Sequence, residues 1–180
     1  MNVYQIRRRS KTFLDSVESE GGSWLDESHP NDSQIEAFSF WVDVKSGEYP
    51  LQDVLGSFSN DLVVSSRLKD LFWAHVIPDF VRAIPLNVKF EGEEVKDPYF
   101  VIHEYNKWCD VANAELSVPE YAGKVLVGYT SLVISREKIT EFDLTSIEPC
   151  RWLVLERIAD LIVDVNMTGL ELKKFVVDES

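Results

Sequence analysis

Short apolar stretches separated by polar turns run along most of this chain, and the pattern predicts many strands and few helices. Residues 2–7 alternate apolar and polar side chains, as a strand with one buried face does, and residues 35–44 contain the aromatic and β-branched side chains that strands favour. We expect the first at the edge of a sheet and the second, rich in aromatic side chains, as a further strand. Residues 15–34 are rich in Ser, Asp, Glu and Gly and are expected to form a loop.

A helical spacing of apolar residues first occurs after residue 64. Residues 62–64 predict a short strand, and Ser65 or Ser66 can cap a helix because a hydroxyl accepts hydrogen bonds from exposed backbone N–H groups. Residues 67–72, RLKDLF, then place apolar side chains at helical intervals, with charged side chains between them. The chain is expected to return as a strand at residues 80–86.

A similar unit recurs further along the chain. Residues 153–155 predict a strand, and residues 157–162, RIADLI, begin a second helical pattern. Its apolar stripe follows the i, i+3, i+4, i+7 spacing and consists of Ile158, Leu161, Ile162 and Val165. Gly169 is expected to end this helix in the left-handed conformation, and residues 170–177 are expected to close the unit as a strand.

The two units align residue by residue, and four pairs of positions match: Arg67/Arg157, Leu68/Ile158, Asp70/Asp160 and Leu71/Leu161. One interpretation is a duplicated strand–helix–strand unit whose two short helices bury their stripes together on a sheet. The other is chance, because basic, acidic and leucine positions recur in many amphipathic helices. Between the units we expect a loop at residues 108–117 and strands at 98–103, 124–129 and 131–135.

Residues 1–180 are therefore expected to form one α+β domain, with mixed, mostly antiparallel sheets and short amphipathic helices. Hydrophobic residues make up 45% of the 180, which is enough for one real core. Cys109 and Cys150 are too few for a disulfide framework. The chain carries neither an apolar run long enough to cross a bilayer nor an export signal, so we expect it in the cytoplasm.

The net charge of −13 narrows the choice of partners. An acidic field of this size repels nucleic acids and anionic membranes and favours proteins with a basic surface. Acidity also keeps many ordinary proteins soluble, and this simpler interpretation stays open.

The sequence contains no recognisable catalytic or metal-binding motif. It lacks the nucleophile-elbow, phosphate-loop and dinucleotide-binding patterns, and His29, His75 and His103 do not have the spacing of metal ligands. We therefore expect no metal and no cofactor, and a binding protein rather than an enzyme. If the protein were an enzyme, His103, Cys109 and Asp110 would be its most plausible polar cluster.

Two acidic segments are candidate binding surfaces. The first surrounds Gly92 and comprises Glu91, Glu93, Glu94 and Asp97. The second lies in residues 26–36 and comprises Asp26, Glu27, Asp32 and Glu36. The first segment predicts either a solvated hairpin turn or an acidic finger that is presented to a basic surface.

Four segments, in a fixed order, resemble a known family. They are LVVSSRLKDLF at residues 62–72, YFVIHEYNKWCDVANAELS at 99–117, SLVISREKI at 131–139 and LVLERIADLIVDVNMTGLELKKF at 153–175. In this order they are similar to the bacterial immunity proteins of polymorphic toxin systems known as immunity family eleven. The family-like part spans residues 61–180, and residues 1–60 form a variable N-terminal part without a match.

The resemblance implies an antidote that binds and neutralises a cognate bacterial toxin. Members of the family are encoded beside toxin genes, and an antidote without an export signal implies a toxin that acts in the cytoplasm. Such a protein would occlude the active site or substrate groove of the toxin, with acidic side chains standing in for phosphates. Two alternatives stay open, namely an enzyme that reverses a toxin's modification and a non-catalytic adaptor domain.

Overall fold

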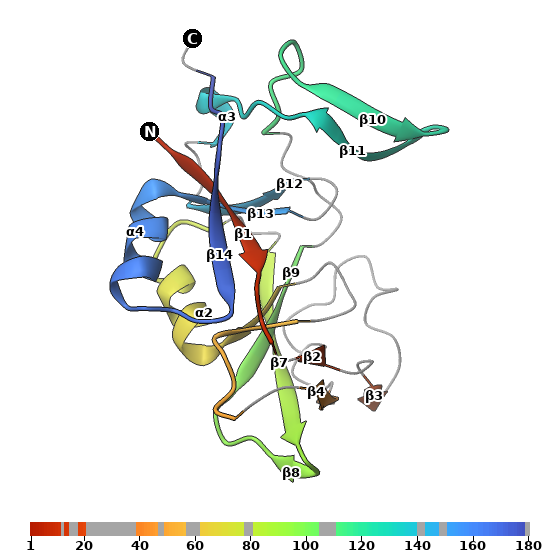
Figure 1. Ribbon diagram of the computed structural model, residues 1–180, viewed down its shortest axis with the longest axis vertical. Helices are drawn as coiled ribbons and strands as arrows, with labels where there is room; N and C mark the ends of the chain where they lie inside the picture. The colour runs from red at the N-terminus through yellow and green to blue at the C-terminus, as the bar shows by residue number, and fades with distance from the viewer. Residues whose placement is uncertain are drawn as a thin grey trace.

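The computed structural model is an α+β fold built from three sheets and short helices (Figure 1). It describes these parts of the chain: residues 1–11, 13–14, 18–20, 39–46, 49–56, 62–77, 81–104, 111–139, 143–147 and 151–178. The prediction of an α+β fold with mixed, mostly antiparallel sheets is confirmed. The ladder between β4 and β7 is parallel, and the other ladders between described strands are antiparallel.

The first sheet joins the two ends of the described chain. Its strand order is β12-β13-β1-β14, with β1 (Val3–Arg8), β12 (Leu144–Ile147), β13 (Arg151–Leu155) and β14 (Leu170–Phe175). Strand β1 pairs antiparallel with β13 on one side and with β14 on the other, so that Val3 lies between Leu155 and Phe175. The prediction that residues 2–7 form an edge strand is wrong. Strands from the far end of the chain pair with both edges of β1, and Val3 and Ile6 are each buried in a hydrophobic cluster, one on either face of the strand.

The second sheet contains most of the middle of the chain. Its main order is β2-β4-β7-β9-β6-β5, and β3 and β8 pair with β4 and β7. The strands are β2 (Phe13–Leu14), β3 (Glu18–Glu20), β4 (Ser39–Ser46), β5 (Val54–Leu55), β6 (Leu62–Ser65), β7 (Val81–Phe90), β8 (Glu93–Glu94) and β9 (Tyr99–Glu104). The predicted loop at residues 15–34 is wrong at β3, which pairs with β4, and residues 15–17 and 21–34 lie outside the described part.

The third sheet is a separate two-stranded hairpin of β10 (Val118–Ala122) and β11 (Val125–Ser131). The sequence predicted two strands, at residues 124–129 and 131–135, and left β10 unassigned. The structure corrects this prediction. A single strand ends at Ser131, and the next apolar residues turn into the body, where Ile134 forms isolated bridges with Ala112 and Val177.

Helices α2 (Ser66–Trp73) and α4 (Glu156–Asp164) lie side by side and share one hydrophobic core, while α3 (Arg136–Ile139) is a single turn (Figure 1). The predicted cap of α2 is confirmed, because the Ser65 hydroxyl accepts a hydrogen bond from the Leu68 N–H at 3.3 Å. The shared core contains Leu68 and Phe72 of α2 and Ile158 of α4, all essentially inaccessible to solvent.

The second helix differs from its prediction at two points. Its buried residues are Ile158, Ala159 and Ile162, whereas Leu161 and Val165 of the predicted stripe are exposed. The helix also ends earlier than expected. Its C-cap is Val165, and Asn166, with φ of 53°, takes the left-handed position that was assigned to Gly169. Asn tolerates this conformation because its short amide can bond locally.

The two aligned units have the same architecture. In β6-α2-β7, strand β9 lies between β6 and β7 and is antiparallel to both. In β13-α4-β14, strand β1 takes that middle place. Because β5 flanks β6 as β12 flanks β13, the order β5-β6-β9-β7 repeats as β12-β13-β1-β14. This match over four strands supports duplication over chance.

A pair of buried aspartates, Asp53 and Asp143, extends the match beyond the residues that the sequence aligned. Asp143 stands 143 − 53 = 90 positions after Asp53, the same offset as between Arg67 and Arg157. The Asp53 carbonyl accepts from the Ser65 N–H at 2.8 Å, and the Asp143 carbonyl accepts from the Leu155 N–H at 3.1 Å. Each aspartate therefore fixes the first residue before the helix of its own unit.

The aspartate side chains reach across to the other unit. The Asp53 carboxylate accepts from the backbone N–H of Thr168, which follows α4, at 2.9 Å. The Asp143 carboxylate accepts from the backbone N–H of Val76, which follows α2, also at 2.9 Å. Each carboxylate also contacts an arginine of its own unit, Arg67 or Arg157. The two units thus hold each other through reciprocal contacts.

Candidate protein-binding surface

The first acidic segment forms the turn of a hairpin at one end of the molecule (Figure 1). Glu91 and Gly92 both have positive φ, 53° and 84°, as in the two-residue turns whose twist suits a tight hairpin. Phe90 pairs with Glu93 and Lys89 with Glu94 on either side of this turn. The prediction of a hairpin turn is confirmed, and its acidic side chains project from the end of a long strand.

The tip of this hairpin is mainly acidic. All four predicted residues are exposed: Glu91, Glu93, Glu94 and Asp97. Two lysines, Lys89 and Lys96, lie in the same segment, and Lys89 is flanked in register by Asp43 on β4 and Glu94 on β8. The tip therefore presents an excess of carboxylates to solvent, in an arrangement that suits a basic partner.

An aromatic pair flanks the acidic tip. The rings of Tyr49 and Phe90 have their centroids 5.8 Å apart, and Tyr49 is 64% exposed. Exposed Tyr is common among residues that anchor protein interfaces, since it offers a large apolar area and a polar hydroxyl. The sequence reasoning did not single out Tyr49, which is distant from the acidic segment along the chain.

The second acidic segment, with Asp26, Glu27, Asp32 and Glu36, lies outside the described residues. The candidate surface is therefore built on the first segment alone.

The residues of the enzyme alternative are only partly described. His103 is half-buried on β9, opposite Arg82, whereas Cys109 and Asp110 lie outside the described residues. Within the described ranges, no three His, Cys, Asp or Glu side chains lie together as metal ligands do. His75 has its Nδ1 3.9 Å from Asp143, whose carboxylate is already bonded to Arg157 and the Val76 N–H.

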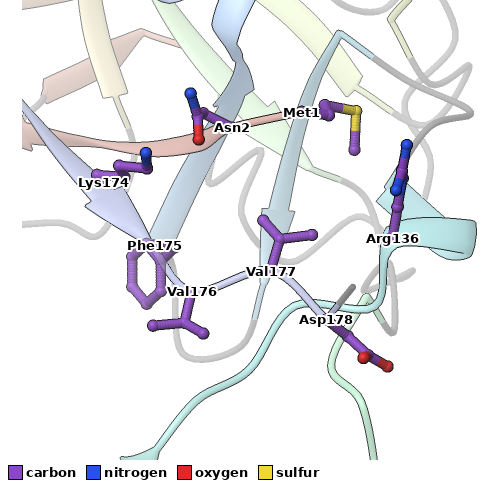
Figure 2. Close-up of a pocket in the computed structure, with 8 residues that line it drawn as sticks. All are labelled: Met1, Asn2, Arg136, Lys174, Phe175, Val176, Val177 and Asp178. Carbon is purple, nitrogen blue, oxygen red and sulfur yellow. The ribbon is translucent and has the colours of Figure 1, made fainter. Parts of the chain in front are cut away.

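A pocket of about 580 Å³ lies between the start of β1 and the end of β14 (Figure 2). Its walls are Met1, Asn2, Arg136, Lys174, Phe175, Val176, Val177 and Asp178. Of its two cations, Lys174 acts electrostatically on the nearby Glu156 carboxylate. The Asn2 amide donates to Glu156 and lowers the pKa of that carboxyl, and Lys174 adds to the effect. The Asp178 carboxylate accepts a hydrogen bond from the Asn113 side-chain amide at 2.6 Å. Both carboxylates, Glu156 and Asp178, therefore already have partners within the protein.

The hairpin β10–β11 is an exposed surface that the sequence reasoning missed. It projects from the end of the molecule opposite the acidic tip (Figure 1). Tyr121 and Val125 are exposed on either side of the turn at Gly123, whose φ is 67°. This glycine, between two runs that contain Val and Tyr, is the sequence signal that could have located the hairpin.

Several residues of the family-like segments have structural roles. The Thr168 hydroxyl donates to Asp53 at 3.0 Å, and a Cβ added to Gly169 would meet the Val54 carbonyl oxygen at 2.2 Å. The Ser117 hydroxyl donates to the Val133 carbonyl and accepts from the Val133 N–H. These segments therefore carry packing and hydrogen bonding at the places where the structure describes them.

Comparison with known proteins adds no assignment: no protein-family model and no curated protein matches this chain. None of the helices in the described part is long and apolar enough to cross a membrane.

Proposed function

We propose that this protein is an immunity protein that binds and neutralises a cognate bacterial toxin in the cytoplasm. The observation that carries the proposal is the acidic hairpin tip, where four exposed carboxylates stand beside the exposed ring of Tyr49. The order of the family-like segments and the net charge of −13 support the same role.

The chemistry of the tip favours a toxin with a basic substrate groove. Carboxylates at the end of a projecting hairpin can enter such a groove and pair with the lysines and arginines that would otherwise hold a phosphate backbone. The acidic field of the whole chain would speed the encounter, because opposite charges steer association. Tyr49 and Phe90 would supply apolar contact area next to the paired charges.

Co-expression with the product of the adjacent gene tests this function. We expect that product to kill cells alone, to be tolerated together with this chain, and to purify with it as a tight one-to-one complex. Protection at much less than equal amounts would instead indicate the enzyme that reverses a modification. A harmless neighbour that does not bind this chain would refute the antidote role.

Charge reversal tests the surface. Glu93→Lys with Glu94→Lys is expected to weaken toxin binding at low salt by about tenfold or more, mainly through slower association. The matched control is Asp160→Lys with Asp164→Lys, which changes the net charge equally on the exposed face of α4. Equal effects of the two double variants would mean that the tip acts only through the overall charge and makes no contact.

A further inference from the structure

The pocket at the start of β1 lies where two neighbouring strands separate. The ladder between β1 and β14 ends at the pair of Val3 and Phe175. Beyond this pair the Asn2 carbonyl accepts a hydrogen bond from the Glu156 N–H at 3.0 Å, whereas the chain after Phe175 turns toward Ile134. The cavity of about 580 Å³ occupies the fork between the two diverging segments (Figure 2).

The body of the protein holds the walls of this cavity in place. The Ile134 N–H donates to the Val176 carbonyl at 3.0 Å, and the Asp178 N–H donates to the Ile134 carbonyl at 2.9 Å. The side chains of Phe175 and Val177 pack against the core cluster that contains Ile134. Binding sites for small molecules are usually pre-formed and enclose about 300–1,000 Å³. The cavity therefore has the size and the fixed walls of a small-molecule site.

The directions of the charged side chains make the interior of the cavity positive. Figure 2 shows the Arg136 side chain extending from the start of α3 toward Met1, whereas the Asp178 carboxylate points away from both. Lys174 lies on the other side of the cavity, where it acts on the nearby Glu156 carboxylate. Arg136 is therefore the cation that the interior presents to a ligand.

A guanidinium with apolar side chains around it suits an organic acid. A guanidinium can donate two parallel hydrogen bonds to a carboxylate, and such charge-assisted bonds are stronger than neutral ones. The apolar side chains that line the same cavity are those of Met1, Phe175, Val176 and Val177. They can cover the hydrocarbon part of a ligand, a part that an inorganic anion does not have.

We propose that this cavity binds a small organic acid, whose carboxylate pairs with Arg136 and whose apolar body lies against Val176 and Val177. Val176 is 67% exposed, so a ligand that covers it removes apolar surface from water. The net charge of −13 favours an acid with a single carboxylate, because the acidic field repels more highly charged anions. The start of β1 lies far from β8 and the acidic tip in Figure 1, and the proposal does not depend on the antidote function.

Isothermal titration calorimetry of the full chain with phenylacetate tests the proposal. The expected result is saturable one-to-one binding. Phenylacetamide, which lacks the charge, and acetate, which lacks the ring, should each bind more weakly by about tenfold or more. No binding of phenylacetate at millimolar concentration overturns the proposal. Acetate or inorganic phosphate that binds as tightly as phenylacetate also overturns it, because the apolar walls would then contribute nothing.

A substitution and a spectrum locate the bound acid. Arg136→Gln should weaken phenylacetate binding by about tenfold or more. The matched control is Lys124→Gln, which removes one positive charge at the exposed turn between β10 and β11 and should bind like the wild type. Equal affinities of these two variants would overturn the assignment to Arg136. On the unsubstituted chain, phenylacetate should shift the backbone amide resonances of residues 176–178 and leave those of β8 unchanged, and the reverse pattern would place the ligand elsewhere and overturn the proposal.

Discussion

The reciprocal aspartates lead to an ordered prediction of stability. Asp53 and Asp143 are both buried and equivalent in the duplicated architecture, but they hold different numbers of donors. The Asp53 carboxylate accepts from the Ser65 hydroxyl at 2.8 Å, the Thr168 N–H at 2.9 Å and the Thr168 hydroxyl at 3.0 Å. The Asp143 carboxylate accepts from one backbone N–H, that of Val76, and from the Arg157 side chain.

The expected losses follow from these partners. A buried donor left without an acceptor costs about 1–3 kcal/mol, and the two hydroxyls of the Asp53 site can rotate to limit the loss. Asp53→Ala should therefore lower the free energy of unfolding by about 3–4 kcal/mol, and Asp143→Ala by about 2 kcal/mol. The arginines add little, because the Arg67 and Arg157 side chains are 55% and 60% exposed and water replaces the lost partner.

Urea unfolding followed by far-ultraviolet circular dichroism measures these differences, with the slope of the transition checked for each variant. Asp160→Ala, at an exposed position of α4, is the control and should stay within about 0.5 kcal/mol of the wild type. The reasoning fails if Asp143→Ala costs as much as Asp53→Ala. It also fails if either buried substitution is as mild as the control.

Two further predictions concern single residues. Gly169→Ala should destabilise the protein by about 3 kcal/mol or more in the same urea assay, because its Cβ would meet the Val54 carbonyl oxygen at 2.2 Å and its φ is 79°. The control is Gly123→Ala, at positive φ in open space, which should cost about 1–2 kcal/mol. Equal losses for the two variants would contradict the steric argument. Burial raises the pKa of the Tyr99 phenol well above its ordinary value, and the charge of Asp53 adds to the effect. Above a pH of about 10 the phenol therefore ionises first in the unfolded chain. The contribution of Tyr99 to the free energy of unfolding is complete below that pH and is lost as the pH rises further. Tyr99→Phe should flatten that alkaline decline in unfolding free energy, and a Tyr99→Phe profile as steep as the wild type would refute the assignment.

Local signals in the sequence predicted local features of the structure. The Ser65 cap and the hairpin at Glu91–Gly92 depend on neighbouring residues, and both were placed correctly. The end of α4 was misplaced because Asn166 and Gly169 both tolerate positive φ, and both adopt it. The spacing of residues alone does not decide which of them ends the helix.

Long-range features could not be read from local patterns. Nothing near residues 3–8 indicates that β1 will lie between two strands from residues 151–175. The role of Asp53 likewise depends on Thr168, which is 115 positions away. The candidate binding surface shows the same limit. Tyr49 lies beside the acidic tip because β4 pairs with β7, and the residues next to Tyr49 in the sequence do not indicate this.

The central place of β1 has a consequence for synthesis on the ribosome. The unit from β5 to β9 can pair its strands once residues 54–104 have emerged, but β1 is made before all its partners and has none until β13 and β14 follow. Throughout most of translation, Val3 and Ile6, which lie on opposite faces of β1 and are buried in two different clusters, therefore lack their native cover. Chaperone binding or a fused N-terminal domain would act on this strand during that interval, and completion of the C-terminal sheet should be the last step of folding.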